Sequence, residues 1–135
     1  MVGPVIALED IQAARERVAE LVHRTPLVRS STLSEAAGTN VYLKLELFQK
    51  TGSFKPRGAF NQLQVLMDES GAERFVGVSG GNFAQGLAFA GQTLGVPVRI
   101  IMPEGTPANY IEATRGYGAA VEIAPTIAEA FARAD

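Results

Sequence analysis

The sequence of 135 residues contains no cysteine and a single histidine. Without cysteine the chain has neither disulfide bonds nor thiolate ligands, and one histidine is too few for a transition-metal site built from the protein alone. We therefore expect no metal site. The absence of cysteine also removes the usual sign of a small secreted domain that is held together by disulfides.

An excess of basic residues is absent as well. Twelve Lys and Arg stand against fourteen Asp and Glu, which gives a formal net charge of −2, and no basic run occurs. Such a chain has no positive field that would attract nucleic acid or an anionic membrane, so we expect neither as a partner. The N-terminal stretch becomes charged early and lacks a long apolar run, so it fits neither a signal peptide nor a membrane span. We expect a cytoplasmic protein.

Apolar residues make up 47% of the chain, which is enough for one ordinary hydrophobic core. Near the N-terminus, apolar residues at helical spacing predict a helix over residues 9–22. After an extended segment, a short helix over residues 32–38 is expected to end at Gly38. Over residues 40–47, leucine and valine alternate with polar side chains, which predicts a half-buried strand.

The second half of the chain has a different and more regular pattern. Short segments rich in Val and Ile alternate with helical segments, which predicts strands at 74–79, 96–103 and 119–125 and helices at 84–95, 107–118 and 126–135. This alternation is typical of right-handed βαβ units around a parallel sheet. We therefore expect an α/β fold for this half.

The stretch KTGSFKPRGAF, residues 50–60, places a lysine at the start of a predicted helix. Apolar residues trace one helix face from Lys55 to a stop at Gly71, and Pro56 is tolerated because the first turn has spare N–H donors. Most lysines in such a place are solvated surface residues, so position alone assigns Lys55 no chemistry. The same stretch separates two differently organised parts, which indicates a domain boundary after residue 52.

The turn VSGGNFAQG, residues 78–86, joins a predicted strand to a helix. In open α/β sheets, ligands bind at the carboxyl ends of such strands, where backbone N–H groups can meet an anion. The turn lacks the Lys and Ser/Thr of a nucleotide-hydrolase phosphate loop and the three spaced glycines of the dinucleotide fingerprint. Two interpretations stay open: a tight turn that needs glycine for its geometry, or a site in which the Asn82 amide caps the helix or holds a ligand oxygen.

Together, the two stretches resemble the N-terminal part of the fold-type II pyridoxal-phosphate enzymes, most closely the threonine/serine dehydratase group. HRTPL, IIMPEGTP and EATRGYGAAVEI extend the resemblance over nearly the whole chain from His23 onward. It implies an incomplete tryptophan synthase beta-like fold, in which a helix and strand segment precedes a small doubly wound parallel-sheet domain. Residues 1–52 then belong to the N-terminal part of the large cofactor domain, and residues 53–135 to a truncated small α/β domain.

The resemblance assigns roles to both stretches. Lys55 is implied to form the Schiff base with the aldehyde of pyridoxal phosphate and then, as a free amine, to remove the Cα proton of the substrate. A helix N-terminus, Arg57 nearby and partial desolvation would favour the neutral amine that this step needs. Phe54 is implied to pack beside the pyridine ring, and Asn82 to donate to the phenolic oxygen of the cofactor. From their residue types, we expect Ser53 to cap the helix and Arg57 to pair structurally.

The turn after the predicted strand is implied to bind the amino-acid substrate. Ser79, Gly80, Gly81 and the following backbone amides of Asn82 and Phe83 would hold the substrate carboxylate. Gly80 stands where racemases of the family carry a serine hydroxyl that acts on the opposite face of the substrate, so its absence favours elimination. The implied reaction is that of an ammonia-lyase, in which loss of the β-hydroxyl leads to a 2-oxo acid and ammonia. The full-length form is implied to be a homo-oligomer.

Two alternatives stay open beside this interpretation. In the resembled family, the glycine-rich loop that grips the cofactor phosphate and the partner of the pyridine nitrogen lie further along than residue 135. The chain is therefore either the N-terminal part of such an enzyme or a noncatalytic remnant or partner subunit of a split enzyme. An unrelated nucleotide-binding α/β domain is the second alternative, which the absent phosphate-loop lysine disfavours.

Overall fold

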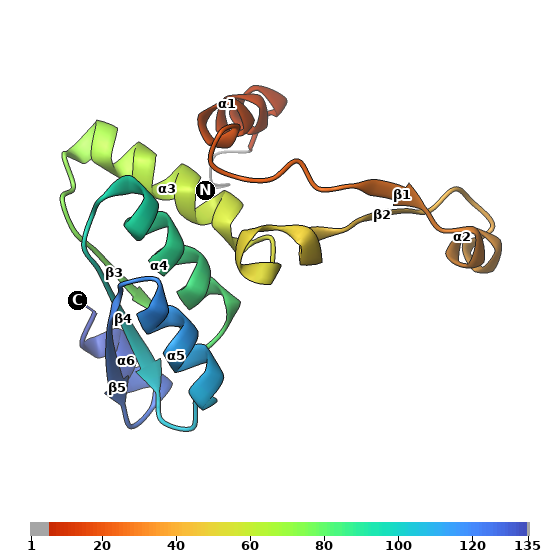
Figure 1. The fold of residues 1–135 in the computed structure, drawn as a ribbon. Coiled ribbons are helices and arrows are strands. Elements are labelled where there is room, and N and C mark those ends of the chain that lie inside the picture. Colours follow the sequence, from red (N-terminus) through yellow and green to blue (C-terminus); the bar gives the residue numbers. More distant parts are fainter. Residues whose placement is uncertain (1–5, 135) are drawn as a thin grey trace, which may run out of the picture.

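The computed structural model describes residues 6–134, which form an α/β part and a projecting arm (Figure 1). Residues 1–5 and Asp135, which the sequence analysis includes in the N-terminal stretch and in the last helix, lie outside the described residues. Within the described part, no helix combines the length and apolar content that crossing a membrane requires. The α/β fold predicted for the second half is confirmed.

The centre of the α/β part is a parallel sheet with the order β3-β4-β5, formed by Phe75–Val78, Val98–Pro103 and Ala120–Ala124. Strand β4 lies in the middle and is buried on both faces. Ile100 and Met102 belong to the larger core cluster, whereas Ile101 between them belongs to a smaller cluster on the other side. This arrangement follows from the two-residue side-chain period of a strand, and it explains the continuous apolar run of β4.

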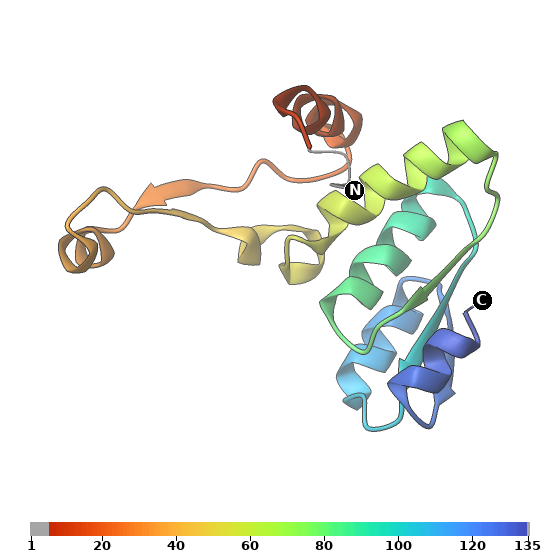
Figure 2. The ribbon, with the colours of Figure 1, turned by 180° about the vertical axis from the view of Figure 1, so that it is seen from behind.

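Helices cover both faces of this sheet, as the doubly wound prediction requires. Helices α4 (Asn82–Leu94) and α5 (Ala108–Gly116) pack over one face, and the short helix α6 (Ile127–Ala132) packs over the other (Figures 1 and 2). Helix α3 (Lys55–Ser70) forms a further layer, since its apolar face with Phe60 packs against α4.

The arm begins after helix α1 (Leu8–Val18), which packs on α3. Strands β1 (Leu27–Arg29) and β2 (Tyr42–Lys44) pair antiparallel and project away from the rest of the chain (Figure 2). Helix α2 (Ser31–Ala37) connects the two strands at the tip of the arm. The arm returns through two 3-10 turns, η1 (Glu46–Phe48) and η2 (Lys50–Gly52), which lead into α3.

The predicted half-buried strand over residues 40–47 is wrong in its length and in its burial. Strand β2 ends at Lys44, and the chain turns into η1 at Glu46. Leu43 and Leu47 are 37% and 63% exposed, because no second layer of the described residues covers this face of the arm. The alternating pattern thus indicates a face that is suited to burial and that these residues leave open.

Glycine determines where several helices end. Gly38 and Gly71 adopt positive φ angles of 66° and 64° directly after α2 and α3, as the sequence predicts.

Two helix bounds differ from the prediction. Helix α1 ends at Val18, four residues before the predicted end at residue 22. Helix α4 begins at Asn82, two residues before the predicted start at residue 84, so the SGG turn runs directly into its first residue.

Candidate active site

Lys55 lies at the start of α3, as predicted from the sequence. The two residues before Ser53 both have positive φ angles, 65° at Thr51 and 68° at Gly52, so the chain reverses sharply before the helix. A β-branched residue in this region of φ is an outlier, which marks the turn as strained. The Lys55 backbone N–H donates to Ser53 Oγ at 3.4 Å, a long hydrogen bond, whereas the N-cap residue of α3 is Phe54 rather than the expected Ser53.

Gly86 brings helix α4 into close contact with Lys55. A Cβ atom built on Gly86 would lie 3.0 Å from Lys55 Cβ and 3.1 Å from the Lys55 carbonyl carbon and from Pro56 N. Residues four apart share one face of a helix, so Asn82 lies on the same face of α4 as Gly86, one turn earlier. The structure therefore brings the lysine stretch and the glycine turn to the same place. Gly86 was not predicted as a site residue, although a glycine within a predicted helix is a sequence sign of close packing.

The turn before α4 leaves several backbone donors free. Ser79 N–H donates to Ile101 O at 3.2 Å, and Gly81 N–H donates to Ser79 Oγ at 3.2 Å. Among the described residues, no acceptor is found for the backbone N–H groups of Gly80, Asn82 and Phe83. Free N–H groups at the start of a helix favour an anion. The Asn82 side chain is exposed and caps nothing, because the N-cap residue is Gly81.

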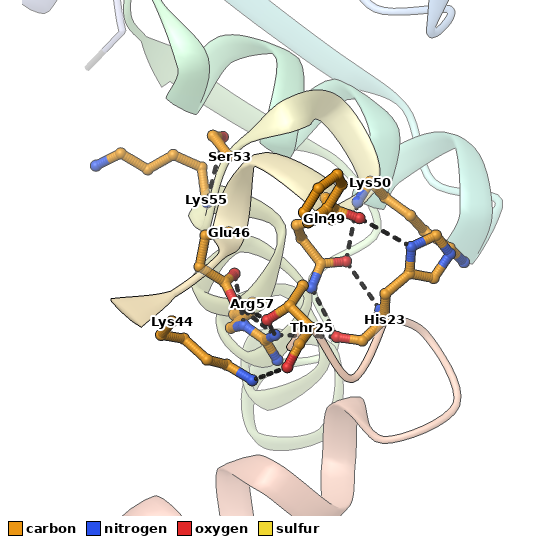
Figure 3. A network of polar contacts seen from close by, with 10 residues as sticks. His23, Thr25, Lys44, Glu46, Gln49, Lys50, Ser53, Lys55 and Arg57 are labelled. Carbon is orange, nitrogen blue, oxygen red and sulfur yellow. Dashed lines mark hydrogen bonds and ion pairs between the residues drawn. The ribbon is translucent and has the colours of Figure 1, made fainter. Parts of the chain in front are cut away.

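The Lys55 side chain is half-buried, and its amine is available. Among the described residues, Lys55 Nζ has no hydrogen-bond or ion-pair partner, and it lies 4.8 Å from the centre of the Phe54 ring. Figure 3 shows that it points away from the neighbouring polar side chains. Phe54 itself is 59% exposed, so it is not a core residue. Phe83 is 36% exposed, and its ring edge lies against Gly77 of β3.

A polar network beside Lys55 was not identified from the sequence. Arg57 Nε and Nη2 donate to the two carboxylate oxygens of Glu46 at 2.9 and 2.8 Å, and Nη2 also donates to His23 O at 3.0 Å (Figure 3). Thr25 joins through its hydroxyl, which donates to Glu46, and Gln49 exchanges two hydrogen bonds with the backbone of His23. The network ties the arm to the first turn of α3. The alternating pattern placed Glu46 on an exposed strand face, which concealed this role.

Arg57 therefore has the structural role that we expected. Its guanidinium lowers the pKa of Glu46 below the ordinary value, chiefly through the hydrogen bond, while burial opposes this effect. A carboxylate thus balances the charge of Arg57. Arg57 was also expected to favour the neutral amine of Lys55. Its guanidinium faces Glu46 rather than Lys55 Nζ (Figure 3), so this effect stays a prediction.

Three cavities of the described residues lie away from Lys55. One of about 360 Å³ is lined by α1, the segment after it, Lys44 and Arg57, and another of about 470 Å³ lies beside α2. Lys55, Asn82 and the SGG turn line none of them. Phe54, Asn82 and Phe83 are exposed, so the candidate active site is an open face of the α/β part.

Comparison with known proteins identifies the family of the chain. The family model for the pyridoxal-phosphate dependent enzyme matches residues 18–135. An L-threonine ammonia-lyase from Thermotoga maritima is 48% identical over 117 residues, which are 87% of this chain and 29% of that protein. The chain thus spans about a third of the length of the curated relatives that it matches.

Solved structures lead to the same family. The structure of maize serine racemase matches with a TM-score of 0.84 and 32% identity over 97% of this chain and 41% of that chain. The processed form of threonine deaminase isoform 2 from Solanum lycopersicum matches with a TM-score of 0.78 and 33% identity over 96% of this chain and 37% of that chain. Three findings agree: the match of the family model, the packing of residues 50–60 against the helix that follows residues 78–81, and the parallel sheet. This chain belongs to the family of pyridoxal-phosphate-dependent enzymes.

Proposed function

We propose that this chain is the N-terminal part of an ammonia-lyase of the threonine/serine dehydratase type. Its substrate would be a small β-hydroxy amino acid, which loses its hydroxyl and then yields a 2-oxo acid and ammonia. The complete enzyme would act in the cytoplasm as a homo-oligomer. The observation that carries the proposal is the close approach of Gly86 to Lys55, which packs the start of α3 against α4 one turn after the free backbone donors at the start of that helix.

The residues present fit one side of pyridoxal phosphate. An amine without a protein partner suits the aldehyde, and the uncommitted Asn82 amide suits the phenolic oxygen beside it. The exposed ring of Phe54, close to Lys55 Nζ, suits the flat face of the pyridine ring. When bound, pyridoxal phosphate draws electrons from the substrate Cα and stabilises the negative charge that proton loss creates.

The chain's own residues would then bind and orient the substrate. The free N–H groups of Gly80, Asn82 and Phe83 would receive the substrate carboxylate, whereas Gly81 N–H is already engaged by Ser79. This binding fixes the direction of the Cα–H bond, and Lys55 Nζ would remove the proton. Gly80 offers no hydroxyl for returning a proton on the opposite face, so we propose elimination rather than racemisation.

The arm supplies an additional argument for a larger protein. The apolar surface of the arm consists of exposed side chains on both of its faces, with Leu27 and Tyr42 on one, Val28 and Leu43 on the other, and Leu47 and Phe48 on η1. An apolar surface of this kind marks a site of interaction. Since the chain spans about a third of its relatives, we propose that the remaining two thirds of the enzyme cover this surface and supply the grip on the cofactor phosphate.

The proposal is tested by trapping the cofactor on the protein. The chain, joined to the C-terminal two thirds of the similar threonine ammonia-lyase, is incubated with pyridoxal phosphate, reduced with borohydride and digested for peptide mapping. We expect the label on Lys55 and nowhere else. The variant Lys55→Ala should remove the label, whereas Lys50→Ala, a matched control five residues earlier, should keep it.

Two outcomes would contradict the proposal. A label that maps to Lys50 or Lys44 would refute the assignment of Lys55. A folded fusion that takes up no cofactor at all would favour the alternative of a noncatalytic remnant. If Lys55 is labelled, formation of a 2-oxo acid from L-threonine or L-serine then tests the reaction itself.

A further inference from the structure

The side chain of Thr106 covers Gly80, although the two residues lie in different loops. A Cβ atom built on Gly80 would lie 2.5 Å from Thr106 Oγ1 and 3.3 Å from Thr106 Cγ2. Strands β3 and β4 are parallel neighbours, with Val78 beside Ile101, so the loops that follow them leave the same edge of the sheet. Thr106 therefore occupies the space that a side chain at residue 80 would need.

Thr106 is held in this place by its own loop. Its hydroxyl donates to Pro103 O at 2.7 Å, and its backbone N–H donates to the same carbonyl at 3.2 Å. Pro107 follows directly and is the N-cap residue of α5, which restricts the backbone further. The hydrogen bond to Pro103 therefore holds Thr106 Oγ1 where it lies against Gly80.

Space, and not backbone conformation, excludes a side chain at residue 80. Gly80 does not have the positive φ angle of Gly71 or Gly105, so its backbone is open to other residues. Its neighbour Gly81 has no atom within 4 Å of its built Cβ atom. The three atoms nearest to a Cβ atom at residue 80 all belong to Thr106, so this side chain is the first obstacle.

We propose that Thr106 is a positioning residue of the substrate turn. It keeps residue 80 free of a side chain and, through its anchor on Pro103, holds the free N–H group of Gly80 in place for the carboxylate of an amino acid. This inference rests on the proposed function of the turn as the amino-acid subsite. It adds a residue of the loop after β4 to a site that the sequence assigned to the loop after β3 alone.

The contact itself is tested by a double-mutant cycle read by thermal unfolding of the chain. Gly80→Ala adds only the clashing methyl group and should lower the unfolding midpoint by about 3–8 °C. In the Thr106→Ala background, the same change should cost less than about 2 °C, because the obstructing atoms are gone. Gly81→Ala is the control, because it shows how a methyl group in open space changes the unfolding midpoint. If Gly80→Ala lowers the midpoint equally in both backgrounds, the proposal is overturned.

The positioning role is tested with a probe that requires no turnover. Phosphopyridoxyl-L-serine, the borohydride-reduced adduct of pyridoxal phosphate and L-serine, carries the carboxylate, whereas pyridoxamine phosphate lacks it. In NMR titrations of the chain, Thr106→Ala should raise the Kd of phosphopyridoxyl-L-serine about tenfold. The Kd of pyridoxamine phosphate should change by less than about threefold. Thr106→Ser, which keeps the anchoring hydroxyl, should restore most of the loss.

The two experiments separate this inference from the proposed function. If Thr106→Ala weakens both probes equally, Thr106 is merely structural and the positioning role is refuted. If the unchanged chain does not prefer the carboxylate-bearing probe, the proposed function of the turn fails, and the positioning role fails with it. The unfolding cycle would still decide whether Thr106 excludes a side chain at residue 80.

Discussion

At the scale of single residues, Gly86 allows helix α4, which follows the SGG turn, to pack closely on Lys55. Alanine favours helices by about 1 kcal/mol over glycine, so Gly86→Ala would stabilise an isolated helix. Here the new methyl group would press on backbone atoms of Lys55 and Pro56, which cannot rotate away. We expect a net loss of about 1–3 kcal/mol in the free energy of unfolding, measured by urea denaturation, and less cofactor trapped on Lys55.

The matched control for this change lies on helix α3. Gly58 is exposed, and a Cβ atom built there meets nothing within 4 Å. Gly58→Ala should therefore leave stability unchanged or raise it by up to about 1 kcal/mol. A Gly86→Ala variant that is as stable as Gly58→Ala would show that the two helices are not as close as the structure has them.

At the scale of elements, the pair of Glu46 and Arg57 joins the arm to the first turn of α3. The Glu46 side chain is 18% exposed, and Arg57 binds both of its oxygens. Glu46→Gln keeps the shape and removes the charge, so we expect the free energy of unfolding to fall by about 1.5 kcal/mol at neutral pH. Glu73→Gln, an exposed position just before β3, is the control and should change little.

The same pair predicts a response to acid with a definite sign. The pKa of Glu46 is lowered in the folded chain, so between the folded value and the ordinary value of 4.5 the unfolded chain binds more protons. The contribution of the pair is fully present above the ordinary value and is lost as pH falls through the folded value. Urea unfolding at steps from about pH 7 to about pH 3 should show that the stability gap between wild type and Glu46→Gln closes in acid. A gap that stays constant would contradict the pairing.

At the scale of the whole molecule, the isolated chain would present only part of the proposed active site. The residues that we propose to hold the aldehyde side of the cofactor lie on an open face, and among the described residues no second glycine-rich loop offers a cradle for its phosphate. We predict weak binding of pyridoxal phosphate and no appreciable steady turnover, because misplacement by about an ångström already costs on the order of a hundredfold in rate.

This prediction is checked by titrating the chain with pyridoxal phosphate and assaying 2-oxo acid formation from L-threonine, with Lys55→Ala as the control. Absorbance reports the bound cofactor, and turnover should not exceed that of the control. Tight stoichiometric binding with clear turnover would mean that copies of the chain complete the site together, with the apolar surface of the arm as the obvious place of contact.

Local patterns in the sequence determined the parallel sheet, the helix that begins at Lys55 and the glycine turn that follows β3. These features repeat with a strand or helix period or use residues with special backbone geometry, so a single stretch reveals them. The domain division after residue 52 stays a prediction. Tertiary structure alone decided the contacts between distant residues: Gly86 with Lys55, Thr106 with Gly80, and Arg57 with Glu46. The spacing of apolar residues predicts which face of a helix or strand a residue occupies, but only the packing of the folded chain determines which residues that face contacts.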